Sequence, residues 1–166
     1  MKVFFAIISL AIITAGCNNN ETGKEHYPSH KYHYVVNDTS KSSIKKSIYV
    51  PVYSNIYFQS GAKRNFLTAT LSIRNISFTD SFYITKVDYY GSQGEQIKKY
   101  IDSAILITPM TSIEFIVEER EKQGGAGANF VVAWNAERIM NEPLIQAVMT
   151  STQYGVSFIT HGTEIK

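Results

Sequence analysis

Residues 66–75, FLTATLSIRN, carry the pattern that decides the fold. Apolar and polar residues alternate along this stretch: the apolar set is Leu67, Ala69, Leu71 and Ile73, and the polar set is Thr68, Thr70, Ser72 and Arg74. Successive side chains of an extended strand point to opposite faces, so each set would share one face. The alternation therefore predicts a β-strand with one face in a core and the other in water.

Two further stretches repeat this alternation. Residues 111–119, TSIEFIVEE, would turn Ile113, Phe115 and Val117 inward. Residues 48–57, IYVPVYSNIY, would place Ile48, Val50 and Val52 on one side and Tyr49, Tyr53 and Tyr57 on the other. Pro51 has no N–H to donate to a neighbouring strand, which predicts an edge strand or a bulge there. More strands are expected at 82–90, 97–101, 104–107, 129–135, 144–150 and 156–160.

Turn residues separate these strands. GSQG at 91–94, Thr-Pro at 108–109 and QGGAG at 123–127 all stand between apolar runs. WNAERIMNE, residues 134–142, is the stretch expected to form a helical turn. About seven to nine short strands with regular turns predict an all-β fold, a two-sheet antiparallel sandwich of immunoglobulin-like type. A small closed β-barrel is the alternative.

The N-terminus predicts export. Lys2 precedes the apolar run VFFAIISLAII, and small residues lead to Cys17 in ITAGCNNN. A basic start, a short apolar segment and small residues at the cut are typical of a secretory signal peptide. The run is too short for a transmembrane helix, which needs roughly 20 apolar residues. Cys17 is the single cysteine of the chain, so a disulfide within the chain is excluded.

The stretch TAGC, residues 14–17, resembles the lipobox of bacterial lipoproteins, although Thr14 stands where an aliphatic residue is usual. The resemblance implies that Cys17 becomes the lipid-modified first residue of the mature chain, with acyl chains such as palmitate holding it in a membrane of the cell envelope. Asn18, rather than Asp, after the cysteine favours the outer membrane. Ordinary secretion with an incidental cysteine is the alternative.

The chain is accordingly expected to have three parts. Residues 1–16 are the signal peptide, 17–46 a lipid-anchored polar linker, and 47–166 the β-sandwich domain. The linker holds His26, His30 and His33, residue types that can bind transition metals. We expect no metal site there, because the segment shows no periodic pattern that would fix a coordination geometry.

A series of motifs carries a second resemblance. YVPVYSNIY, LSIRN, VDYYGSQG, GGAGANFVVAW, EPLIQAVM and GVSFITHG together resemble a family of small bacterial envelope proteins known as domain of unknown function 3124. The resemblance covers residues 48–165. It implies the extent of the domain and its export. The family has no known activity, so no catalytic residue is transferred.

Composition excludes several functions. The net charge is +2 and no Lys/Arg cluster is interleaved with aromatic residues, which argues against a nucleic-acid partner. The sequence has no G-x-S-x-G or H-E-x-x-H motif. His161 is the single histidine of the expected domain. We therefore expect no enzyme, no catalytic residue and no cofactor.

Two functional hypotheses remain. The first is a binding or assembly module that contacts another envelope protein through Tyr49, Tyr53 and Tyr57, since tyrosine is enriched at interfaces. The second is a ligand-binding domain, with a glycan as one candidate ligand, or an enzyme. It would be centred on the GGAGAN loop (residues Gly124, Gly125, Gly127 and Asn129) and on Trp134. A pocket lined by Asn129, Trp134 and Arg74 would favour the second hypothesis. A tight structural loop is the alternative role of the glycines.

Overall fold

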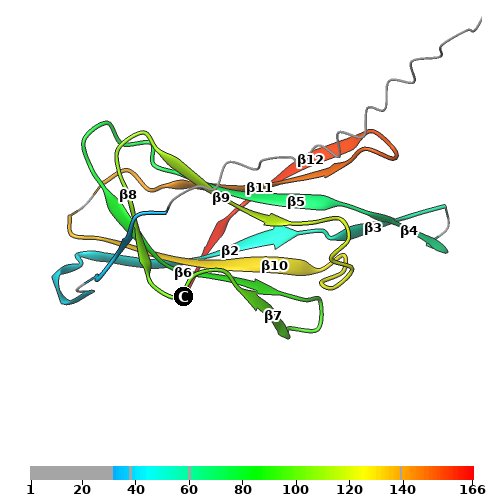
Figure 1. Cartoon of the computed structure of the whole chain (residues 1–166), viewed down its shortest axis with the longest axis horizontal. Helices are drawn as coiled ribbons and strands as arrows, with labels where there is room; N and C mark the ends of the chain where they lie inside the picture. The colour runs from blue at the N-terminus through cyan, green and yellow to red at the C-terminus, as the bar shows by residue number, and fades with distance from the viewer. Residues whose placement is uncertain (1–31, 38, 60, 139) are drawn as a thin grey trace, which may run out of the picture.

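The computed structural model describes residues 32–37, 39–59, 61–138 and 140–166. These residues form a two-layer β-sandwich, with the smaller sheet above the larger one in Figure 1. No helix in the described ranges is long and apolar enough to cross a membrane. The expectations for residues 1–31, including the signal peptide, Cys17, His26 and His30, lie outside the described residues.

The larger sheet has the strand order β1-β8-β6-β10-β2-β13. Its strands are β1 (Tyr34–Val35), β2 (Ile44–Val52), β6 (Phe82–Tyr90), β7 (Gln96–Lys99), β8 (Ala104–Ile107), β10 (Ala128–Ala136) and β13 (Thr163–Ile165). β8 pairs with the first residues of β6, and β7 pairs with the last three residues of β6, Asp88 to Tyr90. A short 3-10 helix, η1 (Thr39–Lys41), lies between β1 and β2. β10 is central, since it pairs antiparallel with both β2 and β6.

The smaller sheet has the order β12-β11-β5-β9, and all its pairs are antiparallel. Its strands are β5 (Thr68–Arg74), β9 (Ser112–Val117), β11 (Leu144–Ser151) and β12 (Val156–His161). A separate hairpin, β3 (Asn55–Phe58) with β4 (Lys63–Phe66), extends from one end of the sandwich (Figure 1).

The core lies between the two sheets. The smaller sheet contributes Ala69, Leu71, Ile73, Phe115, Val117 and Met149, and the larger sheet contributes Val50, Phe82, Val87, Tyr89, Phe130 and Trp134, all of them buried. Every residue of the predicted inward face of 66–75 is buried, as the alternation requires. The prediction of a two-sheet antiparallel sandwich is confirmed, and the sheets are not closed into a barrel.

The described residues form thirteen strands rather than the expected seven to nine, and the stretch 48–57 is divided between β2 and β3. Three further details differ from the predictions. The segment expected to be linker already contributes β1 and the first residues of β2. No helical turn is present in the described part of 134–142, because Trp134 to Ala136 pair with β2. β2 is an edge only in part, since β13 pairs with Ser47 to Tyr49 and ends before Pro51. Pro51 thus lies where this edge of β2 has no paired strand, as a residue without an N–H should, and its carbonyl accepts from the Thr160 hydroxyl at 2.6 Å.

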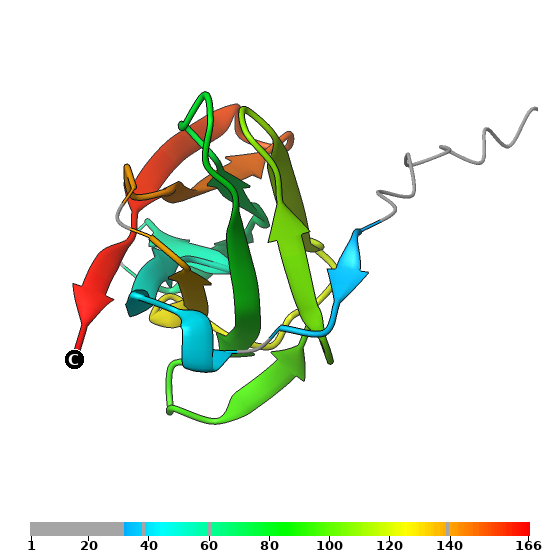
Figure 2. The same ribbon diagram turned by 90° about the vertical axis from the view of Figure 1, so that its left-hand side faces the viewer.

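The chain passes from the smaller sheet to the larger one at Gly162. β12 ends at His161, β13 begins at Thr163, and the Gly162 N–H donates to the Ile145 carbonyl at 2.9 Å. In Figure 2 the last strand, which ends at the C mark, runs down beside the lower layer. A Cβ at Gly162 would collide with Ile48, so this crossing requires glycine.

Candidate functional site

The structure does not bring the three predicted contact tyrosines onto one face. Tyr49 lies on β2 and is half-buried. Tyr53 follows β2 and packs its ring against Phe158, with 5.6 Å between centroids. Tyr57 lies on the separate β3–β4 hairpin, where its hydroxyl accepts a hydrogen bond from Arg64. A single flat tyrosine patch is therefore not formed.

The GGAGAN loop is held by two serines. The Gly125 N–H donates to Ser54 Oγ at 2.7 Å, and the Ser54 N–H donates to the Gly125 carbonyl at 3.1 Å. The Ser92 hydroxyl donates to the Gly124 carbonyl at 2.7 Å and accepts from the Gly127 N–H at 2.9 Å. The loop is thus fastened to the chain after β2 and to the β6–β7 turn. Its backbone groups are used within the fold, which favours a structural role.

The pocket of Asn129, Trp134 and Arg74 that would have favoured the second hypothesis is not formed. Trp134 is 1 % exposed and packs in the core against Phe82, with ring centroids 5.8 Å apart. Asn129 is half-buried on β10, whereas Arg74 lies on β5 in the other sheet. The geometry therefore gives no support to a ligand site centred on these three residues.

A different group of side chains is exposed at one end of the sandwich. Phe78 is 82 % exposed and Met110 is 60 % exposed, and Ile76 and Leu144 are partly exposed beside them. With Arg74 they border a hollow of about 390 Å³, whose further lining residues are Asn75, Thr111 and Ser112. We name this set (Arg74, Ile76, Phe78, Met110 and Leu144) the loop-end surface. Large exposed apolar side chains gathered around a hollow are typical of contact sites.

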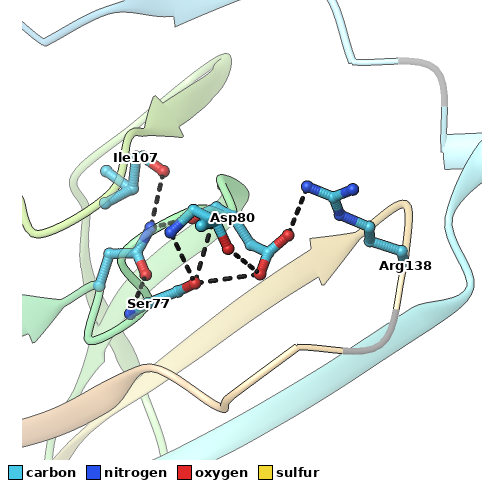
Figure 3. Close-up of polar contacts among 6 residues, drawn as sticks. Ser77, Asp80, Ile107 and Arg138 are labelled. Atoms are coloured by element: carbon cyan, nitrogen blue, oxygen red, sulfur yellow. Dashed lines mark hydrogen bonds and ion pairs between the residues drawn. The ribbon is translucent and has the colours of Figure 1, made fainter.

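A hydrogen-bonded network fixes the loop that presents Ile76 and Phe78 (Figure 3). The Asn75 side-chain amide donates to the carbonyls of Asp80 at 2.7 Å, Thr108 at 3.0 Å and Ile107 at 3.2 Å, and its oxygen accepts from the Ser77 N–H. The Asn75 side chain thus closes the β5–β6 loop and ties it to the end of β8. The Met110 N–H, in turn, donates to the Ser77 carbonyl at 3.2 Å.

Asp80 completes the network. Its carboxylate accepts from the hydroxyls of Ser77 and Thr79, each at 3.0 Å, and pairs with Arg138 at 2.5 Å (Figure 3). The hydrogen bonds from Thr79 and Ser77, together with the Arg138 charge, hold the pKa of Asp80 below its usual value. Phe78 is therefore exposed on a loop held by polar contacts from three segments of the chain.

The lowered pKa gives a pH prediction. A carboxyl whose folded pKa lies below its unfolded value stabilises the fold above the unfolded pKa, and this contribution is lost as the pH falls through the folded pKa. We expect Asp80→Asn to have a lower urea midpoint than the wild type at pH 7. The difference between the two midpoints should shrink progressively below about pH 4. The control is Asp102→Asn, because the Asp102 side chain is almost fully exposed beside Lys99. This variant should leave the midpoint nearly unchanged both at pH 7 and below about pH 4. A difference in midpoint that does not change with pH would contradict a stabilising role for the ionised Asp80 carboxylate.

A second hollow, of about 420 Å³, lies across β2 and β10 on the outer side of the larger sheet. It is lined by Lys45, Lys46, Ser47, Thr85, Ala133, Trp134, Asn135, Glu164, Ile165 and Lys166. Lys46 is bound to Glu142 at 2.5 Å and to Glu164 at 2.7 Å. Among its described lining residues, this hollow lacks the cluster of exposed apolar side chains that distinguishes the loop-end surface.

Within the described ranges no group of three or more His, Cys, Asp and Glu side chains is placed to hold a metal ion. His161 lies at the end of β12, opposite Gln146 on β11. The loop-end surface was not predicted from the sequence. The sequence feature that could have indicated part of it is the stretch NISFTDS, residues 75–81. In this stretch the turn-forming residues Asn, Ser and Thr alternate with the apolar residues Ile and Phe, and Asp follows.

Comparison with known proteins gives one family and one distant structure. No curated protein matches the chain. A solved structure titled "Crystal Structure of Thermotoga maritima 1070" is similar to 71 % of this chain and 92 % of its own, at 9 % identity and a TM-score of 0.41. The family pattern described as "Protein of unknown function (DUF3124)" matches residues 45–165. This match spans most of the chain and covers nearly all of both sheets, so the chain belongs to the DUF3124 family.

Proposed function

We propose that this chain is a lipid-anchored protein of the bacterial cell envelope and that its β-sandwich is a non-catalytic contact module. The observation that carries the proposal is the exposure of Phe78 on a loop fixed by Asn75, Ser77 and Asp80. An exposed apolar side chain on a loop that is already ordered costs little additional backbone entropy on binding, so it suits a contact surface.

The chemistry of the loop-end surface supports a contact role over a catalytic one. Among the described residues that line its hollow, Arg74 is the one charged residue, and the others are apolar or neutral polar. General acid–base catalysis needs a carboxyl, imidazole or similar group in reach of the substrate. The apolar side chains, in contrast, would lose contact with water when a partner covers them.

The sequence supports the anchored location. TAGC at residues 14–17 follows an apolar segment of signal-peptide length, and a cysteine in this position is the attachment point of lipid in bacterial lipoproteins. Another envelope protein is the partner class predicted from the tyrosine-rich composition. Such an anchor would keep the domain beside membrane components of its own compartment.

Site-specific photocrosslinking in living cells tests the contact role. A photoreactive phenylalanine analogue at position 78 of the full-length protein should form an adduct with an envelope component, whether protein or lipid. The control is the same analogue at Tyr154, which is 51 % exposed in the turn after β11, at the other end of this strand from Leu144. Equal labelling at both positions, or none at 78, would remove the loop-end surface as the contact site.

A further inference from the structure

We propose that the loop-end surface rests on the lipid bilayer that holds the anchor, with Phe78 and Met110 entering its interfacial region. This inference rests on the proposed function, because it identifies what the contact module touches. It commits to the bilayer itself, rather than to a protein, as the occupant of this surface.

The place where the chain joins the sandwich is the first argument. β1 runs antiparallel to β8, with Tyr34 opposite Ile105, and the Leu106 N–H donates to the His33 carbonyl at 3.0 Å. Followed backward toward the anchor, the chain runs along β8 toward its end, where the loop with Met110 begins. In Figure 1 the blue β1 lies beside β8. The first described residues therefore join the sandwich in the half that carries the loop-end surface, where the Tyr32 ring packs 5.5 Å from Phe115 of β9.

The length of chain before this point is the second argument. A chain spans at most ~3.5 Å per residue, so residues 17–31 hold Tyr32 within about 50 Å of the lipidated cysteine. A nine-residue strand such as β6 is about 30 Å long. A tether of this length lets the loop end, near which the described chain begins, reach the bilayer, and it would have to extend further for the opposite end, about one strand length away, to do so.

The chemistry of the surface is the third argument. Phe, Ile, Met and Leu side chains project from three separate segments around Arg74, and none of the described residues that line the hollow carries a carboxylate. Apolar side chains enter the region of the headgroups and upper acyl chains, while a long cationic side chain can reach lipid phosphates. Such contacts are individually weak, but a covalent anchor makes them intramolecular and raises the effective lipid concentration.

Fluorescence quenching tests the inference on the intact lipoprotein. The full-length Phe78→Trp variant is reconstituted in vesicles of phosphatidylethanolamine and phosphatidylglycerol whose acyl chains carry bromine near the headgroup. Trp134, buried in the core, supplies a constant background that the wild-type protein measures. The introduced indole at position 78 should lose most of its emission to the brominated lipid and little to aqueous iodide. The control Tyr154→Trp should respond in the opposite way.

Three outcomes decide the matter. Quenching at position 78 by bromolipid supports the bilayer contact. Quenching by iodide overturns it, because the side chain is then in water. Protection from both quenchers also overturns it, because protein then covers the surface. Flotation of the wild-type protein with the vesicles is measured separately. If the protein floats but the indole of the Phe78→Trp variant stays in water, the bilayer contact alone is refuted. If the protein does not float, the anchor is refuted.

Discussion

Gly124→Val is expected to lower the free energy of unfolding by about 3 kcal/mol or more, a larger loss of stability than valine should cause at Gly125 or Gly127. Gly124 has a φ of 106°, where a Cβ is strained, and an added Cβ would collide with the Tyr89 hydroxyl. Tyr89 is fully buried beneath the loop. The core would have to shift its ring or release the loop, and urea unfolding measures the cost.

Two other glycines calibrate this prediction. Gly94 also has a positive φ, of 83°, but nothing lies within 4 Å of an added Cβ, so Gly94→Val should cost only about 1 kcal/mol of backbone strain. Gly125→Val, which meets Ser92 Oγ at 2.6 Å, should cost about 1–3 kcal/mol. Equal losses at positions 94 and 124 would show that the contact with Tyr89 is unimportant. A stable Gly124→Val variant would argue against a structural role for the loop.

Cys17→Ser should abolish the lipid anchor, so that any protein whose signal peptide is removed leaves the membrane fraction. A serine hydroxyl cannot receive the thioether-linked lipid, and the loop-end surface alone is too small to replace acyl chains that each bury many CH₂ groups at roughly 0.8 kcal/mol. Fractionation of cells that express the full-length variant should find it soluble or unprocessed. Asn19→Ser, two residues further along, should leave membrane residence unchanged.

The same experiment can contradict the lipoprotein interpretation. Unchanged membrane residence of Cys17→Ser, together with normal removal of the signal peptide, would show that something other than lipid holds the protein. The urea midpoint of the released variant should equal that of wild type, because the strands of the sandwich begin at Tyr34 in the described residues. A lowered midpoint would instead attribute the change to misfolding.

The strands were predictable where one face is buried and the other is not. β5 alternates apolar and polar residues throughout and β9 does so over its first four residues, and β6 and β8 begin and end at the predicted residues. β1 and β13 were missed because two or three residues are too few to show a period. The order of the strands in each sheet could not be predicted from the sequence. β2 pairs with β10, for example, and no local sequence pattern indicates that these two distant segments are neighbours.

The candidate site was less predictable than the fold. Ile76, Met110 and Leu144 come from three segments, and a single sequence carries no signal that these meet at one end. Apolar residues are also common in loops. Phe78 could therefore be identified as a candidate contact residue only from its exposure and from the hydrogen bonds by which Asn75 fixes its loop. The glycines stood out by composition, yet their partners Ser54 and Ser92 could not be identified without the fold.

The central place of β10 has a consequence for the speed of folding. β2 comes early in the domain, but its principal partner β10 comes after β3 to β9 have been made. Closing so long a loop costs entropy before any contact is gained, and proteins dominated by such distant pairings fold in about milliseconds to seconds. Until β10 arrives, β2 and β6 have no strand between them. The rate-limiting event for this chain is therefore expected to be the entry of a single late strand between two early ones.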